Sequence, residues 1–164
     1  MTATSLLDVI FNRASVRRYR KEPVPQRVLM NILEAGRRAP SAMNAQPWHF
    51  IVVTDEKKKE ALSRRRWTSF LKDAAFIIIG CGEKDKKWST VDVTIALQNM
   101  VLAAEAQGVG SCWIGDFDES EVKKLFGVPD NLKVIALVSF GYPAEKPKPR
   151  PKKPLEQIVH YNKF

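Results

Sequence analysis

The chain contains 164 residues, 45% of them apolar, a composition that excludes global disorder and predicts a single folded domain over residues 1–164. Its 27 lysines and arginines outnumber its 18 acidic residues, so the formal net charge is +9. Two stretches account for this excess, because residues 13–21 hold five cations and no acid, and residues 145–153 hold five cations and one acid. A third basic stretch, residues 57–66, is balanced only by acids elsewhere.

Several protein classes are excluded by what the sequence lacks. No apolar run approaches the roughly 20 residues of a transmembrane helix, and the first residues have no signal-peptide pattern, so we expect a cytoplasmic protein without a membrane partner. The only cysteines are Cys81 and Cys112, and the only histidines are His49 and His160. Neither a disulfide scaffold nor a metal site is therefore expected.

Apolar periodicity, capping residues and prolines predict five helices and four strands. In chain order the helices cover approximately residues 5–12, 25–39, 56–65, 90–107 and 118–126. The strands cover residues 50–53, 74–81, 111–114 and 133–140. Ser5, Asp55 and Asp118 are predicted N-caps, Gly108 is a predicted left-handed C-cap, and the second strand is predicted to end at Gly80 and Gly82.

This order of elements says little about the sheet. Alternating strands and helices by themselves favour a parallel, doubly wound sheet. Neither a dinucleotide fingerprint nor a Walker loop is present, because Gly108-Val109-Gly110 follows a helix where the dinucleotide motif requires a strand. After Gly141 the prolines recur every few residues, which predicts an extended basic arm over residues 143–164.

The sequence contains no recognisable catalytic side chains. There is no Gly-x-Ser-x-Gly elbow, and both cysteines lie among small or apolar residues, as is typical of buried structural thiols. Several polar loops have special conformational requirements, however. This combination is typical of proteins that take their chemistry from a cofactor.

One such loop is residues 40–48, Pro-Ser-Ala-Met-Asn-Ala-Gln-Pro-Trp. Asn44 and Gln46 offer amide donors and acceptors, and the small residues around them permit close approach of a ligand. The loop can bind the edge of a planar heterocycle. A rigid turn between a helix and a strand explains the same residues equally well.

The other candidate is Arg13-Ala14-Ser15-Val16-Arg17, just beyond the end of the first predicted helix. Two guanidinium groups and a hydroxyl can bind a phosphate monoester, although charged stretches are most often solvated surfaces. The predicted arm carries Arg150 and Lys152 at alternate positions. Packing of the arm near residue 13 would strongly favour the phosphate interpretation.

Four motifs in the same order resemble the nitroreductase family of flavoproteins. They are Arg-x-Ser-x-Arg at residues 13–17, Pro-Ser-x-x-Asn-x-Gln-Pro-Trp at 40–48, Gly-Val-Gly-Ser-Cys-Trp-Ile-Gly at 108–115, and Gly-Tyr-Pro at 141–143 followed by the basic tail. The resemblance extends over residues 5–160. It implies an α+β fold with a mainly antiparallel sheet flanked by helices, in place of the parallel default, and an intertwined homodimer with two FMN sites at its interface.

The resemblance also implies roles for individual residues. Arg13, Ser15, Arg17, Arg150 and Lys152 are expected to bind the phosphate and ribityl end of FMN, and Ala14 to contact it through the main chain. Asn44 is expected to hydrogen-bond the pyrimidine edge, with Gln46 supporting the loop. Trp113, Ile114 and Gly115 are expected to lie at the flavin ring. Phosphate and ring residues can come from different subunits in this family, and neither a catalytic side chain nor a metal is implied.

The implied activity is transfer of a hydride from NADH or NADPH through FMN to a nitroaromatic, quinone or similar small-molecule acceptor by a ping-pong mechanism. The alternative is a flavin-binding or carrier protein with little turnover. Nucleic-acid binding is not expected, because the basic residues are not interleaved with aromatic ones and no helix-turn-helix pattern is present.

Two features depart from larger family members. Only the short stretch Glu83–Ser89 stands where those members carry a helical excursion over the flavin, so the substrate face is expected to be wide. Trp88 can form an aromatic wall there or be an ordinary packed side chain. The basic stretch 57–66 has no assigned role, and recognition of the NADPH phosphate is only a weak hypothesis for it.

Overall fold

The computed structural model describes residues 5–145, 147 and 150–164; residues 146, 148 and 149 of the predicted arm lie outside the described part. Its centre is a four-stranded sheet in the order β1-β2-β4-β3. The strands are β1 (Trp48–Val53), β2 (Phe76–Glu83), β3 (Gly110–Ile114) and β4 (Leu132–Gly141). All three pairings are antiparallel.

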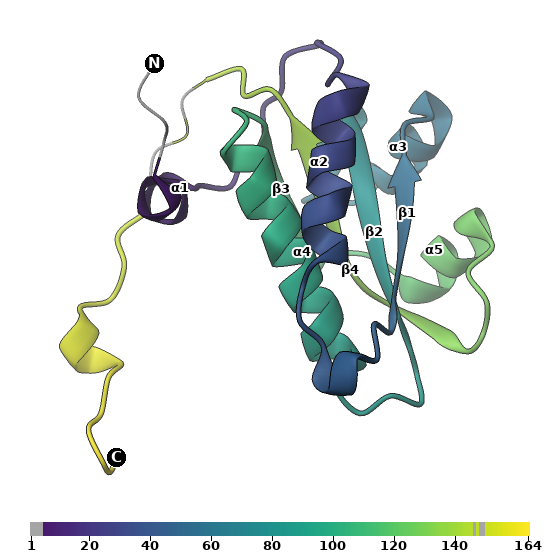
Figure 1. Ribbon diagram of the computed structural model, residues 1–164. Coiled ribbons are helices and arrows are strands. Elements are labelled where there is room, and N and C mark those ends of the chain that lie inside the picture. Colours follow the sequence, from purple (N-terminus) through teal and green to yellow (C-terminus); the bar gives the residue numbers. More distant parts are fainter. Residues whose placement is uncertain (1–4, 146, 148–149) are drawn as a thin grey trace.

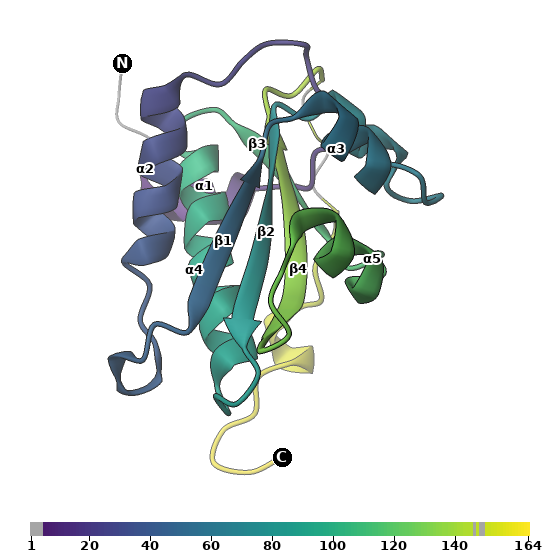
Figure 2. The ribbon, with the colours of Figure 1, turned by 90° about the vertical axis from the view of Figure 1, so that its right-hand side faces the viewer.

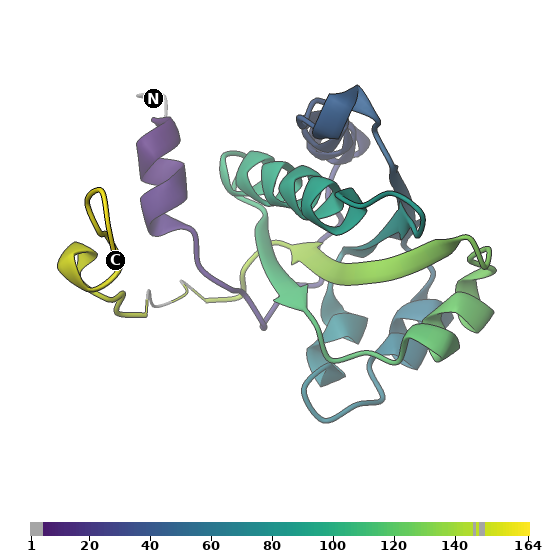
Figure 3. The ribbon, with the colours of Figure 1, turned by 90° about the horizontal axis from the view of Figure 1, so that it is seen from below.

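Helices cover both faces of this sheet (Figures 1, 2 and 3). Helices α2 (Gln26–Arg37) and α4 (Ser89–Glu105) pack on one face, while α3 (Glu56–Leu62) and α5 (Glu119–Phe126) lie on the other. The first helix, α1 (Leu6–Asn12), stands to one side together with the C-terminal arm (Figures 1 and 3). Short 3-10 turns occur at η1 (Ala42–Asn44), η2 (Ser69–Asp73) and η3 (Leu155–Gln157).

The antiparallel sheet implied by the family resemblance is confirmed, and the parallel sheet favoured by strand–helix alternation is wrong. β2 and β3 do run parallel to each other, because each is antiparallel to β4, and α4 makes the crossover between them. β4 then inserts into the space between β2 and β3. Alternation along the chain therefore reflects one crossover unit whose two strands are not neighbours.

The capping predictions are confirmed. The side chains of Ser5, Asp55 and Asp118 accept hydrogen bonds from main-chain amides three residues later, at 3.1, 2.9 and 2.9 Å. Gly108 has φ of 75°, a left-handed conformation that glycine adopts without strain. Helix α3 ends at Leu62 instead of about Arg65, and the Ser63 hydroxyl donates to the Lys59 carbonyl at 2.8 Å, which satisfies one acceptor at the helix end.

The prediction that β2 ends at its glycines is wrong, because the strand continues to Glu83. A Cβ atom at Gly80 would lie 2.7 Å from Cδ1 of Leu97 on α4. Glycine at this position permits the helix to approach the strand and does not terminate it. The two faces of β2 contribute to separate apolar cores, with Ile77 and Ile79 on the α3/α5 side and Phe76 and Ile78 on the α2/α4 side.

The close packing of α4 on the sheet gives a stability prediction. Leu97 is fully buried, so Leu97→Ala should lower the free energy of unfolding by about 2–5 kcal/mol through lost apolar contacts and the cavity left behind. Val91 on the same helix is 47% exposed, and Val91→Ala should change stability by no more than about 0.5 kcal/mol. Urea unfolding measures both. Equal midpoints for the two variants would contradict this packing.

Candidate functional site

Main-chain pairing brings the two basic stretches of the sequence together. Residues 18–20 run antiparallel to residues 142–144, with the Arg20 amide donating to the Tyr142 carbonyl and the Ala144 amide donating to the Arg18 carbonyl, both at 2.9 Å. Arg18 also forms an ion pair with Glu145 at 3.0 Å. The start of the C-terminal arm is thereby attached beside the N-terminal segment, although about 120 residues separate them in sequence.

The segment 13–17 is extended, and its side chains alternate between core and solvent. Ala14 and Val16 are buried, whereas Ser15 and Arg17 are exposed. The Val16 amide donates to the Ser111 carbonyl at 2.9 Å, which aligns the segment with the outer edge of β3. Successive side chains of an extended chain point to opposite sides, so the family motif Arg-x-Ser-x-Arg presents its polar residues on one side.

A cavity of about 380 Å³ lies against this polar side. It is lined by residues from α1, the 13–17 segment and the arm: Phe11, Arg13, Ala14, Ser15, Arg17, Arg150 and Lys152. The arm therefore reaches the Arg-x-Ser-x-Arg motif, which is the arrangement that favours a phosphate site. Four cationic side chains and a hydroxyl surround a space in which no carboxylate is a lining residue.

A second cavity, of about 610 Å³, adjoins the first. The two share Arg17 and Arg150 as lining residues. The floor of the larger cavity is the end of β3 and the residues after it, Cys112–Asp116, and its remaining wall is formed by Arg66, Trp67, Ser69 and Phe70. We refer to these two adjoining cavities together as the groove, which has a cationic end and a wider end large enough for a ring system.

The strand edge at the wide end carries main-chain groups that can bind a ligand. β3 is an edge strand, and its Ser111 carbonyl points outward to accept from Val16. Main-chain groups alternate between the two edges of a strand, so those of Trp113 point outward as well. Among the described residues, the segment that pairs with this edge does so at Ser111 and not at Trp113.

The groove is strongly cationic. Its lining residues include five cations, namely Arg13, Arg17, Arg66, Arg150 and Lys152, and one carboxylate, Asp116. That carboxylate already accepts from Arg65 at 2.9 Å. Burial raises the pKa of the Cys112 thiol, so this groove-lining cysteine is a poor nucleophile at neutral pH.

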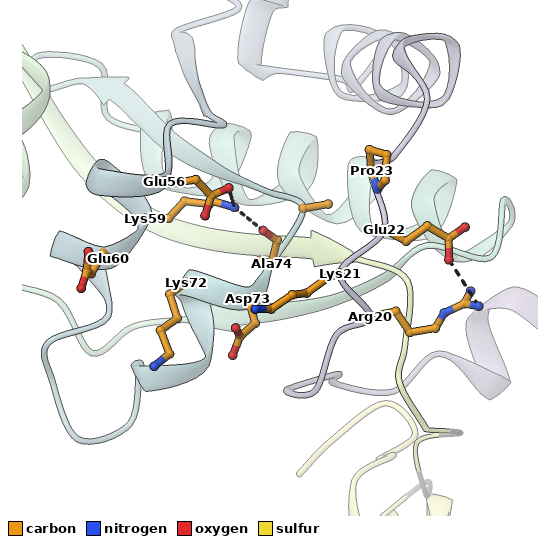
Figure 4. A pocket seen from close by; sticks show the side chains of 11 residues that line it. Arg20, Lys21, Glu22, Pro23, Glu56, Lys59, Glu60, Lys72, Asp73 and Ala74 are labelled. Carbon is orange, nitrogen blue, oxygen red and sulfur yellow. Dashed lines mark hydrogen bonds and ion pairs between the residues drawn. The ribbon is translucent and has the colours of Figure 1, made fainter.

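A different pocket shows that not every charged cavity of this chain attracts an anion. It is lined by four cations and four acids, and Figure 4 shows the side chain of Lys59 directed into contacts with Glu56 and the Ala74 carbonyl. Lys59 is 3% exposed and donates to that carbonyl at 2.7 Å, with the Glu56 carboxylate 2.8 Å away. Arg20 pairs with Glu22 at 3.3 Å in the same pocket. Its charges balance internally, unlike those of the groove.

The loop that contains Asn44 and Gln46 is held in an uncommon conformation. Met43, Asn44 and Gln46 have φ of 53°, 55° and 48°, a region that costs non-glycine residues about 1–3 kcal/mol each. The Gln46 side chain donates to the Asn44 carbonyl at 3.3 Å. Asp92, on the first turn of α4, accepts from the Ala42 amide at 3.2 Å and anchors the loop.

One chain does not bring this loop to the groove. Asp92 binds the loop at the start of α4, whereas Arg13 lies near Glu105 at the end of that helix, where burial raises the pKa of Glu105 and the Arg13 charge opposes the shift. A helix of 17 residues is about 25 Å long. Figure 1 shows η1 and α1 correspondingly far apart. Of the predicted residues, Asn44 and Gln46 therefore lie outside the groove, and the other nine line it.

Comparison with known proteins identifies the fold family. The family model "Nitroreductase family" matches residues 10–75 and 63–142. The chain belongs to the nitroreductase family. It is 35% identical to an iodotyrosine deiodinase from Thermotoga neapolitana, over 97% of this chain and 98% of that protein.

Two solved structures have the same fold. A putative NADH dehydrogenase/NAD(P)H nitroreductase from Bacteroides thetaiotaomicron superposes with a TM-score of 0.91 at 34% identity, covering 97% of this chain and 98% of the other. The NADPH:FMN oxidoreductase of Vibrio harveyi, complexed with NAD⁺, also gives a TM-score of 0.91, at 25% identity over 97% of this chain and 77% of the other. The predicted family and fold are thus confirmed.

This nitroreductase chain has groove residues that the sequence did not reveal. They are Phe11, Arg66, Trp67, Ser69, Phe70, Cys112 and Asp116. Cys112 and Asp116 directly flank the predicted residues 113–115, and Phe11 lies two residues before Arg13, so proximity in sequence was a usable signal. Arg66 and Trp67 come from a loop whose position depends on tertiary packing, and the only signal was a tryptophan after three arginines.

The connection between β2 and α4 is short. It has five residues, and the last of them is Trp88, 52% exposed at the start of the helix near the loop that Asp92 anchors.

Over residues 5–145, 147 and 150–164, no helix is long and apolar enough to cross a membrane. The same described residues hold no cluster of three or more His, Cys, Asp or Glu suited to a metal ion.

Proposed function

We propose that this nitroreductase-family chain is an FMN-dependent oxidoreductase that passes a hydride from NADH or NADPH to a nitroaromatic, quinone or similar electrophile. The observation that carries the proposal is the pair of adjoining cavities that make up the groove. Its narrow end gathers four cations and a hydroxyl from two distant segments, and its wide end lies along an open strand edge. FMN has matching parts, a phosphate dianion at one end and a planar ring at the other.

The side chains present fit this cofactor. Arg13, Arg17 and Arg150 offer planar guanidinium groups for the phosphate, and Lys152 and Ser15 add donors. The outward main-chain groups of Trp113 lie where a ring edge needs partners. FMN is also named for the oxidoreductase from Vibrio harveyi, and NADH and NAD(P)H are named for other relatives, which supports FMN as the cofactor and a nicotinamide as the reductant.

Bound FMN supplies reversible acceptance of two electrons, which none of the chain's own side chains provides. The chain's contribution is to hold the phosphate through Arg13, Arg17, Arg150 and Lys152, and thereby fix the position of the ring against residues 113–115. The outward main-chain N–H of Trp113 would stabilise negative charge on a bound flavin ring. Solvent can supply the acceptor's proton, and reductant and acceptor occupy the same open face in turn, which is ping-pong kinetics.

We further propose that the active form is an intertwined homodimer. Asn44 and Gln46 are displayed on a strained, exposed loop that lies too far from the groove of their own chain, so they would serve the groove of a second copy. Helix α1 exposes four large apolar side chains, Leu6, Leu7, Ile10 and Phe11, although it is only seven residues long. Such a short helix is marginal by itself, and burial against a partner would stabilise it.

The proposal is tested by mixing purified protein loaded with FMN with NADH or NADPH in a stopped-flow spectrometer without oxygen. Bleaching of the flavin absorbance, followed by its recovery on adding nitrobenzene, menadione or 3-iodo-L-tyrosine, is expected for at least one reductant and one acceptor. A colourless protein that cannot be reconstituted with FMN contradicts the proposal. Tight FMN binding without reduction by either nicotinamide would instead identify a flavin carrier.

The phosphate assignment predicts a selective loss of affinity. Arg13→Ala and Lys152→Ala should each weaken binding of FMN by about tenfold or more, because the phosphate loses a charge-assisted hydrogen bond. Riboflavin lacks the phosphate, so its affinity should change by less than about twofold. Quenching of flavin fluorescence by apoprotein measures both ligands, with Arg27→Gln on α2 as the control. Equal losses for FMN and riboflavin would place these cations elsewhere on the flavin.

The shared site predicts complementation between two defective chains. Arg13→Glu and Asn44→Ala should each impair both sites of their homodimers. In a co-expressed mixture, random pairing makes half of the dimers hybrids, each with one intact site, so about one quarter of wild-type activity should return. Activity is measured on the purified mixture and on each parent. No recovery beyond the average of the parents would mean that Asn44 serves its own chain.

A further inference from the structure

Of the six cations in the basic stretch 57–66, to which the sequence assigned no role, three make contacts within the fold and Arg66 faces the groove. Lys59 is buried with Glu56 and the Ala74 carbonyl, and Lys58 lies over the Phe126 ring at 5.3 Å. Arg65 pairs with Asp116 at 2.9 Å. Arg66 lines the wide cavity, and among the described residues it has no acidic partner.

Arg66 is held in position by an aromatic neighbour. Its guanidinium carbon lies 4.9 Å from the centroid of the Trp67 ring, and Trp67, itself 69% exposed, lines the same cavity. A guanidinium that stacks on an aromatic face keeps its N–H groups directed outward in its own plane. Those groups can bind a carboxylate or sulfonate with two parallel hydrogen bonds.

The cofactor phosphate does not account for this cation. Arg13, Ser15 and Lys152 line only the narrow cavity, whereas Arg66 and Trp67 line only the wide one. A phosphate monoester carries about two negative charges at neutral pH, fewer than the four cations around the narrow end. The field at the wide end therefore remains positive when the cofactor is bound.

We propose that Arg66, stacked on Trp67, is an anion-binding subsite that selects aromatic acceptors carrying a carboxylate or sulfonate; this inference rests on the proposed reductase function. The guanidinium covers one face of the Trp67 ring, and the rest of this exposed side chain is open to contact an aromatic substrate next to the charge. The geometry suits a small molecule whose anion is close to its ring. The 2′-phosphate of NADPH is separated from the nicotinamide by two riboses and a pyrophosphate, so it fits a cavity of about 610 Å³ less well.

The test uses FMN-loaded wild-type protein, Arg66→Gln, Arg66→Lys, and Arg64→Gln as a matched control from outside the groove. Steady-state kcat/KM is measured with NADH for 4-nitrobenzoate and for nitrobenzene, which differ by one carboxylate. Arg66→Gln should lower kcat/KM for 4-nitrobenzoate relative to that for nitrobenzene by about three- to tenfold, as expected for a partly exposed charge pair. Arg66→Lys should keep most of the preference, and Arg64→Gln all of it.

Salt gives a second readout. The wild-type preference for 4-nitrobenzoate should fall as ionic strength rises, and that dependence should be absent in Arg66→Gln. An unchanged ratio in Arg66→Gln overturns the subsite. A change in kcat/KM that appears with NADPH and not with NADH also overturns it, because Arg66 would then bind the dinucleotide. Loss of bound FMN overturns it as well, because Arg66 would then bind the cofactor.

The two proposals can fail separately. Protein that is never reduced by NADH or NADPH refutes the reductase function, and the subsite is then tested by titrating 4-nitrobenzoate into the FMN-loaded protein and following the flavin absorbance. Weaker binding to Arg66→Gln than to wild type and Arg64→Gln still supports an anion site. Equal binding by all three refutes it.

Discussion

The short antiparallel pairing of residues 18–20 with residues 142–144 is the interaction on which the proposed site depends. It buries Tyr19, whose hydroxyl lies 2.8 Å from that of Ser139, at the end of the sheet. Gly110 and Gly141 make room for it, because a Cβ at Gly110 would lie 2.6 Å from Val16 and one at Gly141 would lie 2.9 Å from the Tyr19 ring. From this junction one segment leads back to Arg13 and the other leads on to Arg150, so both basic stretches must leave in the same direction.

That arrangement concentrates like charges, which is unfavourable without a counter-ion. Arg18 and Arg20 are neutralised locally by Glu145 and Glu22. Within the described part of the chain the groove cations form no ion pairs, and the Arg13 charge only opposes the raised pKa of the Glu105 carboxyl. A dianion bound there removes the repulsion as well as adding hydrogen bonds, so cofactor binding and ordering of the arm should be linked. The net charge of +9 thus combines a local anion site with cations that already have partners.

Patterns of neighbouring residues predicted local structure well and long-range arrangement poorly, and the correct antiparallel sheet came from the family resemblance. Caps at Ser5, Asp55 and Asp118 depend on residues within one turn, so the pattern was sufficient. The sheet direction depended on where β4 inserts, and the strand end at Gly80 depended on how closely α4 packs; neither is encoded by neighbouring residues. The same distinction holds in the site. Motif residues on extended segments were found, whereas Arg66 and Trp67 required the fold of the α3–η2 loop.

Helix α4 determines how far apart the two groups of proposed site residues lie. Its first turn anchors the strained loop through Asp92, its last turn lies near Arg13, and its buried face fixes it to the sheet through Leu97. The two groups of proposed flavin-binding residues are therefore kept roughly 20 Å apart along the axis of α4, the rise from Asp92 to Glu105. In the proposed homodimer, a two-fold arrangement would bring the start of one α4 to the end of the other and so complete each site. A substitution near either end of α4 would then affect a site to which both subunits of the proposed dimer contribute.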